Sequence, residues 1–197
     1  MNRTVCPEKR PAVFLDRDGT VTESAGYVTT PEQIRLIPDA ADCISQFRRA
    51  GYCCVLVTNQ SAIERGMLSV QELDTIHNEL QTQLAAHGTQ LDAIYISPRK
   101  PNTGDESVIE HFDRKPGPGM LLRAAVDLNL DLSRSWMIGD RLSDVLAGIH
   151  AGCRSIRVRT GYTYRIPDAF VANGFITLAS LTDVADHILR SPTISEQ

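Results

Sequence analysis

Short apolar runs alternate with amphipathic stretches along the chain, and this alternation predicts a fold of β-strands and helices. The apolar runs are continuous, which is typical of strands that helices cover on both faces. Predicted strands lie over 12–15, 53–57, 93–96, 136–138 and 155–158. The pattern therefore indicates an α/β protein built on a doubly wound parallel sheet.

The amphipathic stretches predict helices that have recognisable starts and ends. The clearest is predicted over 69–87, where Ser69 and Glu72 have capping-box spacing and Gly88 follows the last turn. Further helices are predicted over 39–50, 118–126, 142–151 and 181–189. The segment 97–119 is rich in Pro, Gly and charge, and an irregular segment of this length is more often a functional loop than a passive connector.

The composition is that of an ordinary compact protein. With 197 residues, of which 42% are hydrophobic, the chain is predicted to form a single domain over 1–197. No apolar run approaches the roughly 20 residues that a membrane helix needs, so no membrane partner is expected. A formal charge of −4 lacks the basic footprint of a nucleic-acid binder. We therefore expect a small-molecule partner, no nucleic acid, and a monomer.

Two features of the sequence bear on the cellular compartment in which the protein is expected to act. The first ten residues, MNRTVCPEKR, lack the apolar region of a secretory signal, so a cytoplasmic location is expected. The five cysteines form no C-x-x-C or other metal-ligand spacing. An odd set of this kind is more typical of reduced thiols than of disulfides or a zinc site.

Polar residues follow directly after three predicted strands. Asp16 and Asp18 follow the first strand, Thr58 follows the second, and Asp140 follows the strand over 136–138. In open α/β sheets, ligands bind outside the carboxyl ends of the strands. We therefore expect these side chains to meet in one crevice.

The acidic residues of this set predict a metal site. Asp16 and Asp18 are expected to point to one side, where two like charges raise one pKa unless a cation balances them. Asp140 adds a third carboxylate, and an all-oxygen site suits Mg²⁺. An Asx-turn is an alternative interpretation. An EF-hand is less compatible, because it needs Gly at loop position 6 and Glu at 12, where this chain has Gly19 at 4 and Tyr27 at 12.

Three further residues carry weaker signals. Thr58 offers a hydroxyl that suits a phosphate oxygen, although such a residue more often caps a helix. Lys115 lies just before a predicted helix, between Arg114 and Pro116, where a solvated cation is the usual interpretation. Asp144 shares a helix face with Asp140, and both residues are also favoured at a helix start by the macrodipole.

Together these motifs resemble the haloacid dehalogenase superfamily of phosphatases. The matches are DxDGT over 16–20, a Thr at 58, a Lys at 115 and GDxxxD over 139–144. A closer resemblance is to the heptose bisphosphate phosphatases and the related histidinol-phosphatases. It rests on FLDRDGT over 14–20, GYV over 26–28, TNQS over 58–61, RKP over 114–116, GDR over 139–141 and RTG over 159–161.

The resemblance implies a Rossmann-like core without a large cap domain, and Mg²⁺-dependent hydrolysis through an aspartyl-phosphate. Asp16 would be the nucleophile, Asp18 the acid and base, and Thr58 and Lys115 would stabilise the phosphoryl oxygens. Mg²⁺ would be held by the carboxylates of Asp16 and Asp140 and the main-chain carbonyl of Asp18. Substrate contacts are implied for Ser24, Ala25, Gly26, Tyr27, Asn59, Gln60, Ser61, Arg114 and Arg141.

The implied substrate is a small phosphorylated sugar. The resemblance favours removal of the 7-phosphate of D-glycero-D-manno-heptose 1,7-bisphosphate, in the synthesis of cell-surface sugar precursors. Histidinol phosphate and other sugar phosphates are alternatives. A phospho-acceptor receiver domain is a remote alternative, because receivers accept phosphate after their third strand and lack a group such as Asp18.

One segment departs from the family pattern. The heptose enzymes usually carry a zinc loop, C-x-H followed by C-x-C, between the third strand and the lysine. Here Ser97, Arg99, His111 and Asp113 stand at the corresponding places. We therefore predict no structural zinc.

Overall fold

A six-stranded parallel sheet forms the centre of the molecule. The computed structural model describes residues 8–24, 26–161 and 175–190, and its strands lie in the order β3-β2-β1-β4-β5-β6. The strands are β1 (Ala12–Leu15), β2 (Cys53–Asn59), β3 (Ala93–Ser97), β4 (Trp136–Gly139), β5 (Arg154–Val158) and β6 (Ile176–Leu178). From β1 near the middle of the sheet, the chain first adds β2 and β3 towards one edge and then β4, β5 and β6 towards the other. This order confirms the predicted doubly wound α/β fold.

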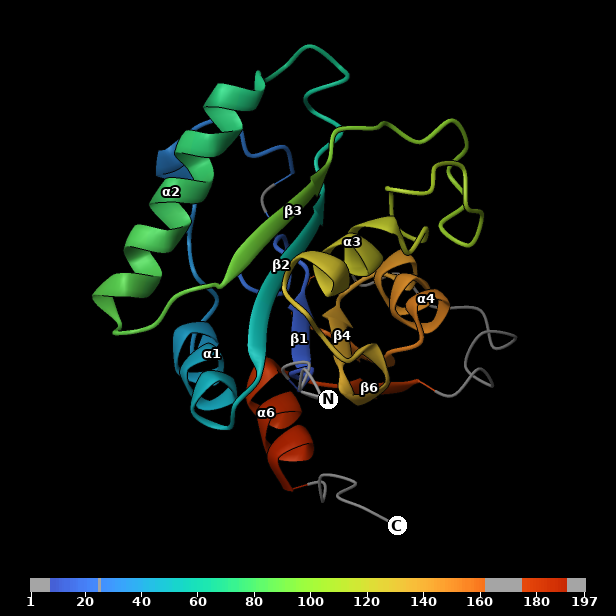
Figure 1. Cartoon of the computed structure of the whole chain (residues 1–197). Coiled ribbons are helices and arrows are strands. Elements are labelled where there is room, and N and C mark those ends of the chain that lie inside the picture. The colour runs from blue at the N-terminus through green and yellow to red at the C-terminus, as the bar shows by residue number, and fades with distance from the viewer. Residues whose placement is uncertain (1–7, 25, 162–174, 191–197) are drawn as a thin grey trace, which may run out of the picture.

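Helices cover both faces of the sheet (Figure 1). Helices α1 (Ala40–Arg49), α2 (Val70–Ala86) and α6 (Leu181–Arg190) pack on one face, and α3 (Gly119–Asp127) and α4 (Leu142–Ala151) pack on the other. Two short 3₁₀ turns lie at Pro31–Gln33 and Leu132–Arg134. Among the described residues, no helix combines the length and apolar character that a membrane span requires.

The side chains of the central strands divide into two cores. Val13 and Leu15 of β1 point to the core beneath α1, α2 and α6, whereas Ala12 and Phe14 point to the core beneath α3 and α4. Because successive strand residues face opposite ways, a strand that is buried on both faces must be apolar throughout. This requirement explains the continuous apolar runs in the sequence.

The bounds of all five predicted helices agree with the structure to within one residue. α2 begins with the predicted capping box, in which the Glu72 N–H donates to Ser69 Oγ at 3.2 Å and the Ser69 N–H donates to the Glu72 carboxylate at 2.7 Å. α4 has the predicted bounds. These agreements arise where a cap and an apolar stripe occur together.

Two strand predictions need correction. The sequence analysis did not predict β6, which has three residues and lies at the sheet edge, too short for a recognisable pattern. β2 also continues two residues beyond the predicted end, so that Thr58 and Asn59 belong to the strand. The hydroxyl of Thr58 therefore does not lie at a helix start.

The cysteines within the described residues are buried free thiols. These are Cys43, Cys53, Cys54 and Cys153, while Cys6 lies outside the described residues. Burial raises the pKa of the Cys43 and Cys53 thiols to about 11. Thiols with so high a pKa are protonated and unreactive at neutral pH.

Candidate active site

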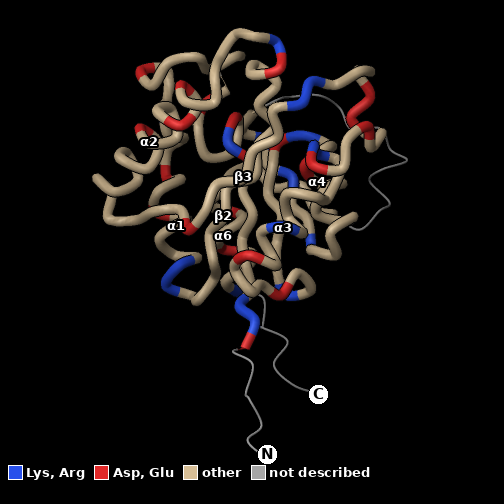
Figure 2. The backbone as a smooth tube through the Cα atoms, turned by 45° about the horizontal axis from the view of Figure 1, so that its top comes forward, with Lys and Arg blue, Asp and Glu red and all other residues tan. Residues whose placement is uncertain are grey.

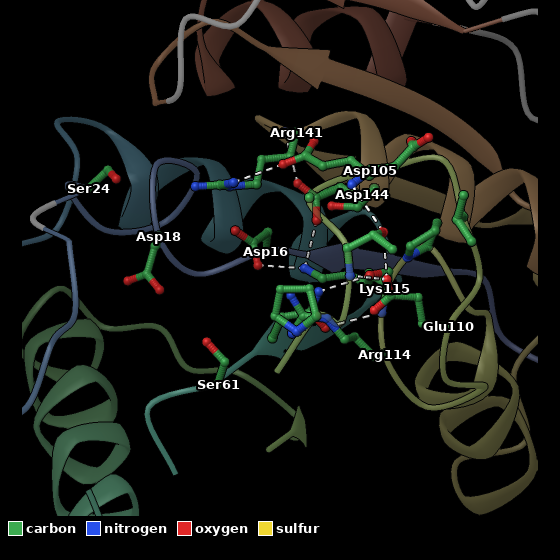
Figure 3. A pocket seen from close by; sticks show the side chains of 18 of the residues that line it. Asp16, Asp18, Ser24, Ser61, Asp105, Glu110, Arg114, Lys115, Arg141 and Asp144 are labelled. Atoms are coloured by element: carbon green, nitrogen blue, oxygen red, sulfur yellow. Dashed lines mark hydrogen bonds and ion pairs between the residues drawn. The ribbon is translucent and has the colours of Figure 1, made fainter. Parts of the chain in front are cut away.

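A cavity of about 430 Å³ opens at the carboxyl ends of β1, β2 and β4, where the sequence predicted a crevice (Figure 3). Most predicted site residues line it: Asp16, Asp18, Ser24, Gly26, Tyr27, Asn59, Ser61, Arg114, Lys115 and Arg141. Thr58, Gln60 and Asp140 are buried close to this end of the sheet. Ala25 lies outside the described residues.

The ammonium group of Lys115 lies at the centre of the site. Its Nζ atom is 2.5 Å from Asp16 Oδ1 and 2.8 Å from Asp144 Oδ1, and it donates to the Val57 carbonyl at 2.7 Å. Burial opposes the charge of this group, but the two carboxylates outweigh that effect and the pKa of Lys115 is raised. Lys115 is therefore a fixed cation, not a solvated one.

The backbone of Lys115 is held by the side chain of Asn59. The Lys115 N–H donates to Asn59 Oδ1 at 3.1 Å, and Asn59 Nδ2 donates to the Lys115 carbonyl at 3.0 Å. This pair of bonds joins the end of β2 to the segment before α3. Asn59 was predicted to contact substrate, and the structure also gives it the task of positioning the lysine.

Three buried carboxylates converge beside Lys115. Oxygen atoms of Asp16, Asp140 and Asp144 lie within 4.8 Å of one another. Burial raises the pKa of Asp16 to about 7; Lys115 opposes this rise, and the charges of Asp144, Asp18 and Asp140 add to it. So much negative charge in a buried place favours a bound cation, and a donor set made only of oxygen atoms fits Mg²⁺.

The carboxylate cluster differs from the one that the sequence predicted. Asp144 takes the place in the cluster that the sequence analysis gave to the Asp18 carboxylate. Asp144 lies in the first turn of α4, which directs its side chain towards the end of β1. The Asp18 carboxylate is outside this cluster. The predicted contribution of Asp18 through its main-chain carbonyl does not depend on the direction of its side chain.

A close approach of glycine fixes Asp140 in this cluster. Gly19 has a φ of +83°, and a Cβ atom there would lie 2.6 Å from Asp140 Oδ2. The segment after β5 is also held close to Gly19, because the Thr160 hydroxyl donates to the Gly19 carbonyl at 2.7 Å. Only glycine combines this φ with the space that the carboxylate needs.

The carboxylate of Asp18 faces Arg17 and Gln60 instead of Asp16. In Figure 3, Asp18 stands on the side of the pocket that carries Ser24 and Ser61. Asp16 and Asp18 line the same pocket, but only the carboxylate of Asp16 belongs to the cluster. The chain turns after Leu15, so the alternation of a strand does not set the direction of the Asp18 side chain.

Comparisons with known proteins agree with this geometry. A family model described as HAD-hydrolase-like matches residues 112–184. The D-glycero-D-manno-heptose-1,7-bisphosphate 7-phosphatase of Thermosynechococcus vestitus is 41% identical over 162 residues, which cover 80% of this chain and 83% of that protein. The chain belongs to this family of HAD-like hydrolases.

Two further relatives extend the comparison over most of the chain. The D-glycero-beta-D-manno-heptose-1,7-bisphosphate 7-phosphatase of Escherichia coli K12 is 37% identical over 182 residues, covering 91% of this chain and 94% of that protein. A crystal structure of the B. bronchiseptica D,D-heptose 1,7-bisphosphate phosphatase, complexed with magnesium and phosphate, has a TM-score of 0.78 at 30% identity. That match covers 91% of this chain and 98% of the other.

The loop between β3 and α3 contains the segment where the sequence analysis predicted no structural zinc. Hydrogen bonds to carboxylates hold this loop: the Glu110 carboxylate accepts from the N–H groups of Asn102 and Thr103, both at 2.6 Å. The Glu64 carboxylate accepts from the Lys100 N–H at 2.5 Å and lies 3.3 Å from Arg99 Nη1. The carboxylates of Glu64 and Glu110 therefore hold this loop in place.

Charged residues of this loop and of the α4 start form the rim of the pocket. Arg141 Nη1 donates to Glu106 Oε1 at 2.8 Å, and Arg114 Nη1 donates to the Arg99 carbonyl at 2.6 Å. Figure 2 shows acidic and basic segments side by side at this end of the sheet. Burial lowers the pKa of Arg114, which remains far above neutrality for a guanidinium.

Several pocket residues were missed by the sequence analysis. Arg65 lies over the ring of Tyr27, with its Cζ atom 5.9 Å from the ring centroid, and both residues line the cavity. Glu106 and Glu110 also line it. The sequence held no periodic or spacing signal for these loop residues. Arg17 does not line the cavity and was also missed; it lies two residues after the end of β1 and is buried, and a buried cation requires a partner.

Proposed function

We propose that this chain is a Mg²⁺-dependent phosphatase that removes the 7-phosphate of D-glycero-D-manno-heptose 1,7-bisphosphate. The observation that carries the proposal is the contact of Lys115 Nζ with Asp16 at 2.5 Å and with Asp144 at 2.8 Å, at the floor of an open pocket. This arrangement presents one carboxylate and one fixed cation to the same incoming phosphate. The names of the relatives supply the substrate class.

In the first step, a carboxylate oxygen of Asp16 attacks the phosphorus atom. The bond between phosphorus and the sugar oxygen breaks, and that oxygen takes a proton from Asp18, leaving a neutral alcohol and an aspartyl-phosphate. Asp18 lines the pocket with its side chain about one quarter exposed, so the leaving oxygen can reach it. Proton transfer of this kind contributes about 10²- to 10⁴-fold to a rate.

In the second step, water attacks the phosphorus atom of the aspartyl-phosphate. Asp18, now ionised, takes a proton from this water, the bond between phosphorus and the Asp16 oxygen breaks, and phosphate leaves. Both residues return to their starting states. Lys115 faces the non-bridging oxygens throughout, where a preorganised charge in a partly dry site acts more strongly than in water.

The cation is proposed to be held by carboxylate oxygens of Asp16, Asp140 and Asp144 and by the main-chain carbonyl of Asp18. When bound, Mg²⁺ supplies positive charge that keeps Asp16 ionised and offsets the charge of the phosphoryl group. The buried oxygen donors support this assignment. Thr58 is proposed to stabilise the phosphoryl oxygens. Its hydroxyl oxygen accepts a hydrogen bond from Gln60 Nε2 at 2.8 Å, which fixes its position.

The phosphate that is not cleaved is proposed to bind at the rim. Arg114 and Arg141 line the pocket at the side of the β3–α3 loop, and a guanidinium fork matches the geometry of a phosphate. Ser24 and Ser61 lie on the side of Asp18 in Figure 3, and Tyr27 also lines the pocket; the hydroxyls of these residues suit the sugar. A bisphosphate can therefore contact both sides of one cavity.

We also propose that the chain acts as a cytoplasmic monomer with one domain over 1–197. The described cysteines are free thiols, which suits a reducing compartment. Light scattering of the purified protein tests the monomer. A stable dimer would reject that part of the proposal.

A kinetic screen with Mg²⁺ tests the proposed function. The two anomers of heptose 1,7-bisphosphate, histidinol phosphate and a panel of sugar monophosphates are ranked by kcat/KM, and ³¹P spectra identify the position that loses phosphate. We expect a heptose 1,7-bisphosphate to lead the ranking by at least about tenfold, with loss at position 7. A preference for histidinol phosphate would reject the substrate assignment.

A further inference from the structure

Arg17 is buried completely although it lies between two residues of the site. Its exposed fraction is 1%, and it is among the largest fully buried side chains. A guanidinium in such a place is tolerated only when its N–H groups are paired. Its fork meets both oxygens of Asp18: Nε donates to Oδ1 at 2.9 Å and Nη2 donates to Oδ2 at 2.9 Å. This two-point contact fixes the direction of the carboxylate.

Gln60 forms hydrogen bonds with both Arg17 and the Asp18 carboxylate. Its Oε1 atom accepts from Arg17 Nη2 at 3.1 Å, while its Nε2 atom donates to Asp18 Oδ2 at 3.3 Å and to Thr58 Oγ1 at 2.8 Å. The amide therefore has its oxygen towards the cation and its nitrogen towards the acceptors. Gln60 thus connects Asp18 to the end of β2.

His77 supports Arg17 from the other side. This residue of α2 is 6% exposed, and its Nε2 atom lies 3.4 Å from Arg17 Nη1. Burial and then the charge of Arg17 lower the pKa of His77 to about 4, against a small opposing effect of Asp18. The ring is therefore neutral at pH 7, and its Nε2 atom can accept from the guanidinium. A protonated ring would place two cations in contact.

We propose that Arg17, Gln60 and His77 are positioning residues that hold the Asp18 carboxylate in the direction needed for proton transfer. This inference rests on the proposed function, which assigns proton transfer to Asp18. The three side chains act through Asp18, and none of them belongs to the carboxylate cluster that is proposed to bind Mg²⁺. Their loss should therefore slow the steps that need a proton and spare the attack by Asp16.

The two steps can be separated with 4-nitrophenyl phosphate. Its leaving group is stable as an anion and needs no proton, whereas hydrolysis of the aspartyl-phosphate still needs Asp18 as a base. In Arg17→Met, we expect the first-turnover burst of nitrophenolate to keep its rate within about threefold. Steady-state turnover should fall by about 10- to 100-fold. This loss is smaller than the full contribution of acid and base catalysis, about 10²- to 10⁴-fold, because Asp18 is still present. Phosphorylated enzyme should accumulate.

A pair of His77 variants gives a second, milder test. His77→Leu removes the acceptor for Arg17 and is expected to lower steady-state turnover by about three- to tenfold, again with the burst retained. His77→Gln keeps a neutral acceptor and is expected to restore turnover to within about twofold of the parent. His87→Leu, at an exposed position after the same helix, is the matched control and should change neither phase.

The outcomes separate this inference from the proposed function. If folded Arg17→Met or His77→Leu slows the burst and the steady state equally, or changes neither, the positioning role is wrong. If Arg17→Met does not fold, the His77 pair decides. If the parent enzyme itself shows no phosphorylated intermediate and no heptose bisphosphate turnover, the proposed function fails first.

Discussion

The floor and the rim of the pocket are held by contacts of different strength. On the floor, Lys115 and Asp144 have side chains only 2% and 1% exposed, whereas at the rim the paired side chains of Arg141 and Glu106 are 45% and 28% exposed. Removing one partner of a buried pair costs about 3–5 kcal/mol, while an exposed pair contributes about 0.2–1 kcal/mol. The groups proposed to react are therefore fixed by the fold. The charged pair at the rim, which is proposed to take part in substrate choice, is held weakly between the start of α4 and the loop.

The strongest test of the floor is Asp16→Asn. The change is nearly isosteric but removes the attacking oxygen's charge, so kcat is expected to fall by at least about 10³-fold. Phosphate release from heptose bisphosphate measures the loss. Thermal melting should show that the variant folds. Asp74→Asn, an exposed aspartate of α2, is the matched control and should keep the parent rate. Parent-level activity in Asp16→Asn would reject Asp16 as the nucleophile.

Removal of the cation is expected to be nearly as severe. EDTA should abolish turnover and Mg²⁺ should restore it, because three buried carboxylates lie within 4.8 Å and lack a balancing dication without it. A measurement independent of activity is the melting transition: Mg²⁺ at 100 times its Kd should stabilise the fold by about 2.7 kcal/mol. Asp140→Asn should weaken this stabilisation. Turnover that resists the chelator would exclude the metal role.

The same contrast explains what could be predicted from the sequence. Asp16 and Asp140 were predicted to meet because they follow buried strands whose order fixes their place in the sheet. Lys115 was assigned to the same site only through the family resemblance. Asp144 was noticed as a helix-start residue and as part of the GDxxxD motif, but it was not assigned to the metal site, since helix periodicity does not reveal what faces the first turn. The contacts of the Asp18 carboxylate with Arg17 and Gln60 were not predicted, because the turn after β1 has no period.

The rim was predictable only through resemblance. Arg114 and Arg141 were inferred from motifs, and both line the pocket. Their partners, Glu106 and the Arg99 carbonyl, come from the loop between β3 and α3, whose conformation depends on hydrogen bonds such as those of Glu110. Such contacts leave no pattern of apolar spacing. β6 escaped prediction for the related reason that three half-exposed residues carry little signal.

The buried layer behind Asp18 predicts a pH dependence of stability. The pKa of His77 falls from 6.5 to about 4 on folding, so between these values the unfolded chain binds a proton that the native protein does not. Stability is therefore complete above pH 6.5 and is lost as the pH falls towards 4, by about 3 kcal/mol in all and about 2 kcal/mol at pH 5. Urea unfolding at pH 7 and pH 5 measures this loss.

The comparison with His77→Gln isolates this residue. Glutamine does not titrate, so its variant should lack the loss of about 2 kcal/mol between pH 7 and pH 5. Asp16 also titrates in this range, but it is present in both proteins and its contribution cancels in the difference. Equal losses in the parent and the variant would show that His77 is not buried as a neutral ring.

The smallest expected effect lies at the rim, in Glu106→Gln. The Glu106 carboxylate accepts a hydrogen bond from Arg141, which is proposed to bind the phosphate that is not cleaved. The substrate must therefore displace the Glu106 carboxylate from Arg141. Because the pair is exposed, its removal should change affinity by at most about 1 kcal/mol, which is a KM for heptose bisphosphate lowered by up to about fivefold. The value of kcat should stay within twofold, and KM for a sugar monophosphate should not fall. The matched control is Asp186→Asn, which breaks a pair of the same 2.8 Å length on α6, at the opposite end of the molecule in Figure 1. A raised KM in Glu106→Gln would mean that this carboxylate contacts the sugar directly and is part of the binding surface.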